Sequence, residues 1–214
     1  MYLKRKADAY LNAWKSDPNR SPLIIKGPRQ VGKTETIDYF AAHNYRSVVE
    51  INFVEEPKYR AITADGYGAN TIVRNISLID PAKKFIPGDT LIFFDEIQAH
   101  PDIATALKFF KIDGKYDVIC SGSMLGISYK QIESNSVGYK TDYEMRSLDF
   151  EEFLWARGYD EAVIESMFTH LCDATPFSEV EMNVFSTAFM DYCVLGGMPA
   201  VVASHIRTGT FEGT

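Results

Sequence analysis

The sequence predicts a three-layer α/β domain with a parallel β-sheet, followed by a helical segment. Short apolar runs alternate with helix-compatible stretches from Leu23 to Leu148, as in parallel strands joined by helices. The four consecutive apolar residues 91–94 suit a strand that is buried on both faces, which is typical of a parallel sheet. Of the 214 residues, 46% are hydrophobic, enough for one large domain, or for one domain and part of another.

The N-terminal residues 2–16 have the spacing of an amphipathic helix, and the turn-forming residues 17–22 end it. Arg5 and Lys6 fall largely outside the apolar face, so we expect them on a solvated helix face. Contact of these two cations with a nucleotide or a partner is the alternative.

A phosphate-binding pattern, G-x-x-x-x-G-K-T, follows the first apolar run. Its residues are Gly27, Pro28, Arg29, Gln30, Val31, Gly32, Lys33 and Thr34. The apolar run 23–25 precedes the pattern and the helix-compatible run 35–42 follows it, which is the strand–loop–helix context that a P-loop requires. A glycine turn before an ordinary helix is the alternative interpretation.

The residue types of this loop suit the chemistry of phosphate. Small residues at Gly27 and Gly32 let the backbone approach closely, so that N–H groups point at the anion. The helix that starts near Gly32 presents the positive end of its dipole. We expect Lys33 to reach the β- and γ-phosphates and neutralise developing charge, and the Thr34 hydroxyl to bind Mg²⁺.

Two carboxylates end the apolar strand that begins at Thr90. Asp95 and Glu96 would lie at the carboxyl edge of the sheet, where ligands bind in open α/β folds. We expect Asp95 to hold Mg²⁺, directly or through water, and Glu96 to orient and deprotonate the attacking water. A strand that simply ends in a charged turn is the alternative.

The next strand, 116–120, is followed by Ser121-Gly122-Ser123. A polar side chain here could touch the γ-phosphate or the attacking water, and we slightly prefer Ser121 to Ser123. A plain Ser-Gly-Ser turn is nearly as well supported by the pattern. His100, before a proline and without a neighbouring His or Cys, is predicted to be structural.

Further elements are predicted on both sides of these motifs. They are a strand at 47–53, a loop with a short helix at 55–68, helices at 70–79 and 102–111, a polar segment at 129–139, a strand at 141–148, and helices at 150–157, 161–172 and 178–194. Asp149 and Glu152 have the spacing of a capping box, and Gly158 is expected to end that helix.

Composition excludes several classes of protein. A net charge of −7 argues against broad, non-specific nucleic-acid binding. The three cysteines are far apart, so neither a disulfide framework nor a zinc knuckle is implied, and a reducing, cytoplasmic compartment fits best. We expect no signal peptide, because Asp8, Asn12 and Lys15 interrupt any apolar stretch at the N-terminus, and no apolar run in this sequence approaches membrane-spanning length.

Several segments, taken in order, resemble a prokaryotic family of predicted AAA-type ATPases. These segments are 22–34, 51–53, Asp95-Glu96-Ile97-Gln98, Ser121-Gly122-Ser123-Met124-Leu125-Gly126, 148–154 and Gly196-Gly197-Met198-Pro199. The family joins an ATPase domain to a C-terminal domain of poorly defined function. The resemblance implies an AAA-like P-loop fold with the P-loop strand central in the sheet. It assigns Lys33 and Thr34 to phosphate and Mg²⁺, Asp95 and Glu96 to the second motif, and Ser121 or Ser123 to the sensor position.

The resemblance also predicts the domain organisation. Residues 1–175 would form the ATPase domain, and 176–214 the helical start of a C-terminal domain that continues further in relatives. We therefore expect a truncated chain, whose apolar side chains around Phe185, Phe189 and Leu195 and at 201–203 lack part of their packing partner and favour a homo-oligomer.

Two features depart from the family pattern. Relatives often carry a basic residue directly after the glycine that corresponds to Gly138, whereas here Tyr139 follows and Lys140 comes next. No arginine finger is identified, and Arg146 and Arg157 are candidates for that role only because they are arginines. Arg29 lies inside the loop, which favours a local role for it over a role in trans.

Three functions remain open, in this order. The first is Mg²⁺-dependent hydrolysis of ATP coupled to a conformational change. The second is a nucleotide-gated module with negligible turnover, which presents its C-terminal domain to a protein or nucleic-acid partner. The third is a kinase for a small molecule. The residues do not specify the base: no guanine-selecting N-K-x-D pattern appears, and the expectation of ATP rests partly on the resemblance.

Overall fold

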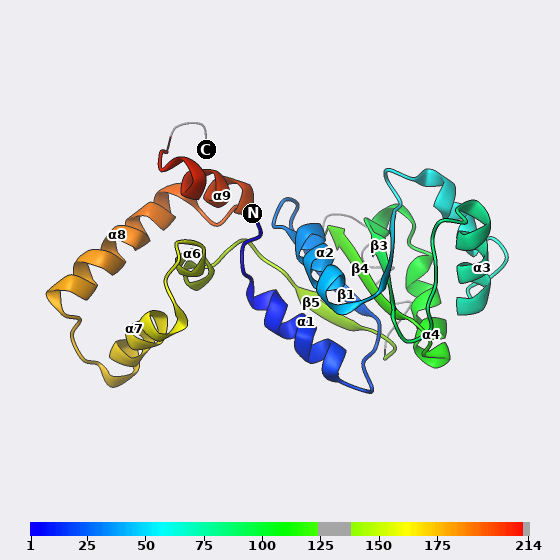
Figure 1. Ribbon diagram of the computed structural model, residues 1–214, viewed down its shortest axis with the longest axis horizontal. Coiled ribbons are helices and arrows are strands. Elements are labelled where there is room, and N and C mark those ends of the chain that lie inside the picture. The colour runs from blue at the N-terminus through cyan, green and yellow to red at the C-terminus, as the bar shows by residue number, and fades with distance from the viewer. Residues whose placement is uncertain (124–137, 212–214) are drawn as a thin grey trace. The chain divides into compact units, whose positions relative to one another are not determined.

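The computed structural model describes residues 1–123 and 138–211, and its described strands form one parallel sheet (Figure 1). The strands are β1 (Leu23–Gly27), β2 (Ser47–Asn52), β3 (Thr90–Asp95), β4 (Asp117–Ser123) and β5 (Thr141–Glu144). Their order is β2-β3-β4-β1-β5, so the P-loop strand β1 is an interior strand between β4 and β5. The predicted parallel α/β class is confirmed.

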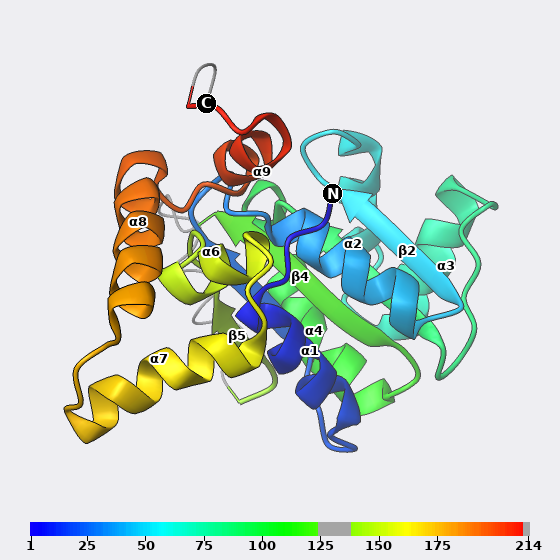
Figure 2. The same cartoon turned by 60° about the vertical axis from the view of Figure 1, so that its left-hand side comes forward.

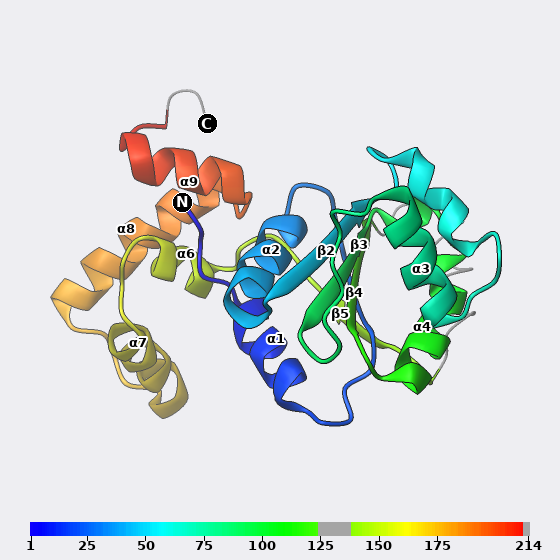
Figure 3. The ribbon, with the colours of Figure 1, turned by 45° about the vertical axis from the view of Figure 1, so that its right-hand side comes forward.

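Helices cover both faces of this sheet, which makes the three layers (Figure 3). The helices of this part are α1 (Lys6–Ser16), α2 (Lys33–Asn44), α3 (Ala69–Ile79) and α4 (Ile103–Asp113), with short 3₁₀ helices at Pro57–Thr63 and Ile97–Ala99. α2 lies on one face, and α3 and α4 lie on the opposite face. α2, α3 and α4 follow β1, β2 and β3, as the crossover connections of a parallel sheet require, whereas α1 precedes β1.

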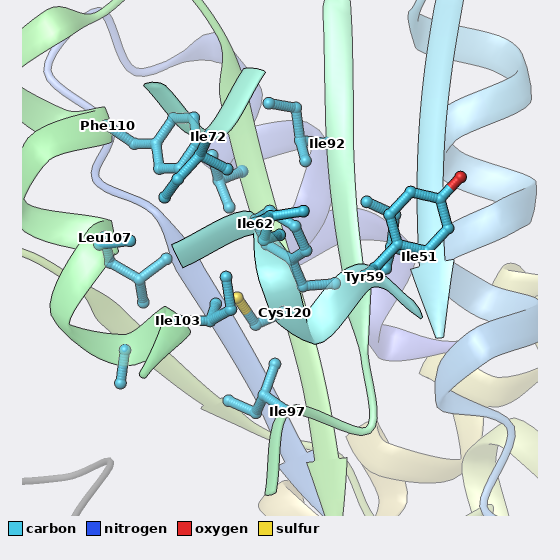
Figure 4. Close-up of a cluster of buried hydrophobic side chains, with 14 of the residues drawn as sticks. Ile51, Tyr59, Ile62, Ile72, Ile92, Ile97, Ile103, Leu107, Phe110 and Cys120 are labelled. Atoms are coloured by element: carbon cyan, nitrogen blue, oxygen red, sulfur yellow. The ribbon is translucent and has the colours of Figure 1, made fainter. Parts of the chain in front are cut away.

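One face of the sheet builds a large hydrophobic core (Figure 4). Ile92 and Phe94 of β3 point into it together with Ile72 of α3 and Leu107 of α4. Every residue of β3 is buried, because helices cover the strand on both sides. The uninterrupted apolar run 91–94 is therefore the signature of a strand without a solvent face.

The C-terminal helices form a second packed group around α6 (Figure 2). They are α6 (Phe150–Ala156), α7 (Glu161–Asp173), α8 (Glu179–Leu195) and α9 (Pro199–Thr208), and α6 contacts the other three. Asp149 accepts a hydrogen bond from the Glu152 amide while the Glu152 side chain accepts one from the Asp149 amide. The predicted capping box is thus confirmed.

The chain divides into two compact units. The sheet unit comprises Tyr10–Arg29 and Lys33–Met145, and the helical unit comprises Met1–Ala9, Gln30–Gly32 and Arg146–Thr214. The tip of the P-loop thus groups with the helical unit, whereas Lys33 and Thr34 belong to the sheet unit. The functional boundary predicted between residues 175 and 176 stays a prediction.

Some predicted elements differ from those observed. The strand at 141–148 is limited to Thr141–Glu144, whereas β4 continues through Ser123, so Ser121-Gly122-Ser123 is strand and not turn. α9 was not predicted, and α1 begins at Lys6 rather than at Tyr2. Residues 129–137 of the predicted polar segment lie outside the described residues.

The apolar side chains near the C-terminus that were expected to be exposed are only partly so. Phe185, Leu195 and Val202 are buried within the helical unit, whereas Phe189 is half exposed. Among the described helices, none has the length and apolar character needed to cross a membrane.

Candidate functional site

The P-loop begins where β1 meets β5. The Met145 amide donates to the Lys26 carbonyl at 2.7 Å, which brings the backbone after β5 against the end of β1. A Cβ on Gly27 would lie 2.0 Å from the Met145 carbonyl oxygen, so only glycine fits there. Further along the loop, Gln30 and Gly32 have φ values of +64° and +88°. Left-handed residues at these positions curl the backbone, as a loop that surrounds an anion must be curled.

Lys33 is the first residue of α2 and is only 8% exposed. Its ammonium group donates to the carbonyls of Gly27 at 3.1 Å and Pro28 at 2.6 Å. Burial lowers the pKa of Lys33, and the nearby Glu96 and Asp95 carboxylates partly oppose this change. Within the described residues Lys33 forms no ion pair; its hydrogen bonds are to neutral carbonyls, and the two carboxylates act on it from a longer distance. A buried cation at the N-terminus of a helix fits a phosphate.

Asp95 lies at the carboxyl end of β3, and its carboxylate accepts four hydrogen bonds. Oδ2 accepts from Thr34 Oγ1 at 3.3 Å and from Asn52 Nδ2 at 3.2 Å. Oδ1 accepts from the Ser121 hydroxyl and from the Glu96 amide, the latter at 3.0 Å. Asp95 is 4% exposed, so these donors replace water around a buried carboxylate.

This arrangement fits a magnesium ion held largely by phosphate and water. Thr34 and Asp95, the two predicted protein ligands, lie within hydrogen-bond distance of each other. Burial raises the pKa of Asp38 and of Glu50, and neighbouring carboxylates, Asp95 among them, raise the pKa of both further. No group of three or more His, Cys, Asp or Glu side chains among the described residues could hold a metal by itself. A site with one carboxylate and one hydroxyl suits Mg²⁺ that arrives with a nucleotide.

Glu96, next to Asp95, has an unusual backbone conformation. Its φ of +54° is unusual for a residue with a side chain, and such strain occurs often at functional sites. The Gln98 amide group donates to Glu96 Oε2, and Gln98 Oε1 accepts from the Ser123 amide at 3.3 Å. Gln98 therefore connects the Glu96 carboxylate to the end of β4.

The structure brings together most residues that the motifs predicted. Lys33, Thr34, Asp95 and Ser121 form one cluster in the sheet unit, and Glu96 is adjacent to it. The Ser121 hydroxyl donates to Asp95, whereas Ser123 donates through its backbone amide to Gln98. His100, predicted to be structural, is buried and bonds to Thr63 at 3.0 Å.

Sequence reasoning missed the roles of Asn52 and Gln98 and misplaced Arg5. A polar residue at the end of a strand next to β3 was the available signal for Asn52, which is paired with Asp95 in the register of the sheet. The expectation of a solvated face at Arg5 is wrong, because Arg5 is 4% exposed and its guanidinium is engaged by protein groups. Lys6 does lie at the surface, in ion pairs with Asp149 and Glu151.

Three other basic residues that the structure describes are paired or exposed. Arg157 pairs with Asp191 at 2.6 Å, Lys140 pairs with Asp142 at 2.6 Å, and Arg29 is exposed. A trans role for any arginine therefore stays untested.

Comparisons with known proteins add four findings. A family model described as an AAA domain matches residues 19–154. A structure of Drosophila ORC bound to DNA superimposes with a TM-score of 0.52 at 13% identity, over 94% of this chain and 58% of that one. A structure of C. elegans PCH-2 gives a TM-score of 0.48 at 12% identity, over 94% of this chain and 62% of that one. No curated protein matches the sequence significantly.

These comparisons differ in what they support. At 13% identity the ORC likeness concerns the fold alone, and it agrees with the parallel sheet and P-loop strand described above. The PCH-2 match, with a TM-score under 0.5, adds nothing to this. The chain spans about 60% of the length of the structures it matches.

Proposed function

Because the chain belongs to the AAA domain family, we propose that it binds ATP with Mg²⁺ and hydrolyses the β–γ bond, coupling this reaction to a conformational change. The observation that carries the proposal is the contact of Thr34 with Asp95 beside the buried ammonium of Lys33. This contact unites the two motifs of a P-loop ATPase at the carboxyl edge of one sheet.

Each residue has one proposed role. The backbone of residues 27–34 and the Lys33 ammonium hold the phosphates, and Thr34 and Asp95 hold Mg²⁺. Bound Mg²⁺ supplies neutralisation of charge on the phosphate oxygens. Glu96 orients a water molecule and accepts its proton, while Ser121 keeps the Asp95 carboxylate in place through its hydroxyl.

The decisive experiment measures ATP turnover and ATP affinity of the parent chain, Lys33→Ala and Glu96→Gln. We expect Lys33→Ala to weaken binding and to lower turnover by about 10²–10³-fold, because it removes a preorganised positive charge. Glu96→Gln should keep the affinity of the parent while its turnover falls by about 10²–10⁴-fold, the contribution of a general base. Equal turnover in Glu96→Gln and the parent would contradict the role of Glu96.

A nucleotide-gated module with negligible turnover is the second candidate function. The hydrogen bond from Gln98 favours it, because it engages one of the two carboxylate oxygens of Glu96 and so lowers the capacity of this side chain to accept a proton. A parent chain that binds ATP tightly but does not hydrolyse it would support this candidate. The acidic balance of residues 146–214, with eleven Asp and Glu against three Lys and Arg, favours a protein over a nucleic acid as the partner of the C-terminal segment.

A further inference from the structure

Arg5 is a buried cation whose contacts lie entirely within the helical unit. Its Nε donates to Glu152 Oε1 at 3.1 Å, and both side chains are almost fully buried. One terminal nitrogen donates to the Arg146 carbonyl at 2.6 Å, and the other donates to the Val31 carbonyl at 2.8 Å. Val31 is the fifth residue of the P-loop, so the guanidinium connects the loop backbone to α6.

Glu152 is itself held firmly enough to fix the direction of Arg5. Its Oε1 also accepts from the Lys6 amide at 2.7 Å, and its Oε2 accepts from the Asp149 amide at 3.1 Å in the capping box. A planar guanidinium with a fixed carboxylate on one edge has little freedom to turn. The nitrogen that faces Val31 is thus preorganised, and the loop carbonyl follows it.

The direction of the Val31 carbonyl sets the direction of the next amide. Because the peptide bond is planar and trans, the Gly32 N–H points opposite to the Val31 C=O. The carbonyl turns toward Arg5, so the Gly32 N–H turns away from it. Gly32 itself lies against this group, since a Cβ there would be 3.6 Å from the Arg5 nitrogen and 3.6 Å from Cγ of Pro199.

We propose that Arg5 is a positioning residue for the P-loop: it holds the Val31 carbonyl so that the Gly32 amide is presented to a phosphate before any nucleotide arrives. The part that concerns phosphate rests on the proposed function. The part that concerns the loop backbone does not, because the Arg5 contacts join protein groups only. Arg5 does not touch the reacting atoms and acts only through the peptide of Val31 and Gly32.

The test compares Arg5→Lys with Arg157→Lys in the full chain. Both changes keep a positive charge and remove a guanidinium group from the helical unit. Arg157, however, bonds to Asp191 and not to the loop. Hydrogen exchange of the peptide that covers residues 27–33 is measured without nucleotide, and the Kd for ATP with Mg²⁺ is measured well below the melting temperature of each variant. We expect Arg5→Lys to speed loop exchange and raise Kd by about tenfold each, since a charged hydrogen bond is lost. Arg157→Lys should change neither.

The outcomes separate this proposal from the proposed function. Parent-like loop exchange in a folded Arg5→Lys protein would overturn the positioning role. Faster loop exchange in Arg5→Lys, with a parent that does not bind ATP, would support the positioning role and overturn the nucleotide function. If Arg5→Lys does not fold, Glu152→Gln replaces it: this variant keeps the guanidinium and loosens its anchor, and a smaller increase in loop exchange is expected. Unchanged exchange in Glu152→Gln would then count against the proposal.

Discussion

His100 shows how a residue can be structural and still control the response of the fold to pH. Its ring lies 4.9 Å from the ring of Phe53, and its Nε2 is bonded to the Thr63 hydroxyl. Burial lowers the pKa of His100, Arg60 lowers it further, and Asp102 partly opposes the change. The folded protein therefore favours the neutral imidazole of His100. In the unfolded chain His100 has the ordinary histidine pKa of about 6.5.

We predict that the parent loses stability as the pH falls below about 6.5, because the unfolded chain then binds a proton that the folded protein resists. The contribution is fully present above that pH, and its slope cannot exceed about 1.4 kcal/mol per pH unit for one proton. Urea unfolding at pH 7.5 and 5.5 measures the loss of stability between the two pH values, in the parent and in His100→Gln. The variant should be less stable at pH 7.5 but should lose less on acidification. An equal loss in both proteins would exclude His100 as the cause.

Residues of the site differ in how far the sequence could predict them. Lys33, Thr34 and the Asp95-Glu96 pair belong to local patterns whose spacing is set by one strand and one loop. Gln98 and Arg5 act through long-range contacts, and no local periodicity reports those. A buried arginine in particular looks in sequence like a solvated one, because its burial depends on a carboxylate about 150 residues away.

At the scale of elements, the approach of β5 to β1 fixes what the P-loop strand can contain. β1 and β5 pair in parallel from Leu23 with Thr141 to Lys26 with Glu144. The chain then continues as Met145, whose carbonyl oxygen lies where a side chain on Gly27 would have to go. Gly27 is thus required by the packing of two strands as well as by phosphate chemistry.

We predict that Gly27→Ala lowers the free energy of unfolding by at least about 2 kcal/mol, because the new methyl group meets backbone that cannot move aside without breaking the pairing. The melting temperature should fall by about 4–8 °C. Gly68→Ala is the matched control: its φ of −62° suits alanine, and a Cβ there meets nothing closer than Thr71 Oγ1 at 3.5 Å. A thermal scan in which both variants melt alike would show that the clash is relieved at little cost.

Elements with a strong pattern were predicted well, and those set by tertiary contacts were not. β3 and the capping-box helix α6 carry their signals within a few residues. The end of β5 after Glu144 has no such signal. Met145 still bonds to Lys26 of β1, and the chain then leaves the sheet, where Leu148 bonds to Gly197. β4 extends through a Ser-Gly-Ser sequence because β1 pairs with it as far as Gly27 and Ser123.

At the scale of the whole molecule, α8 is more exposed to solvent than its apolar sequence would lead one to expect. It is apolar around its circumference: Phe185 and Leu195 are buried, yet Met190 is 62% and Val194 is 70% exposed. A helix of this kind is usually covered on all sides. Between α6, α7 and α8 there is also a groove of about 530 Å³, with Phe168 and Phe189 among its lining residues. Exposed apolar surface of this extent favours association.

We predict that the chain associates with itself through α8 and that added salt strengthens the association. The segment 146–214 has eleven acidic against three basic residues, so two copies repel each other until the Debye length shortens from about 10 Å at 0.1 M to about 3 Å at 1 M salt. Sedimentation velocity at rising protein concentration, at both salt concentrations, measures this. A double variant, Met190→Gln with Val194→Gln, should stay monomeric at the concentrations at which the parent associates.

The control for that variant is a similar change on the sheet unit. Leu78 of α3 is 67% exposed, so Leu78→Gln removes a comparable apolar group without touching α8. We expect Leu78→Gln to associate as the parent does, because association through α8 depends on a contiguous apolar surface and not on any single exposed side chain. Loss of association in Leu78→Gln would place the contact on the sheet unit. A parent that remains monomeric at both salt concentrations would mean that repulsion and the entropy of association outweigh the burial of this surface.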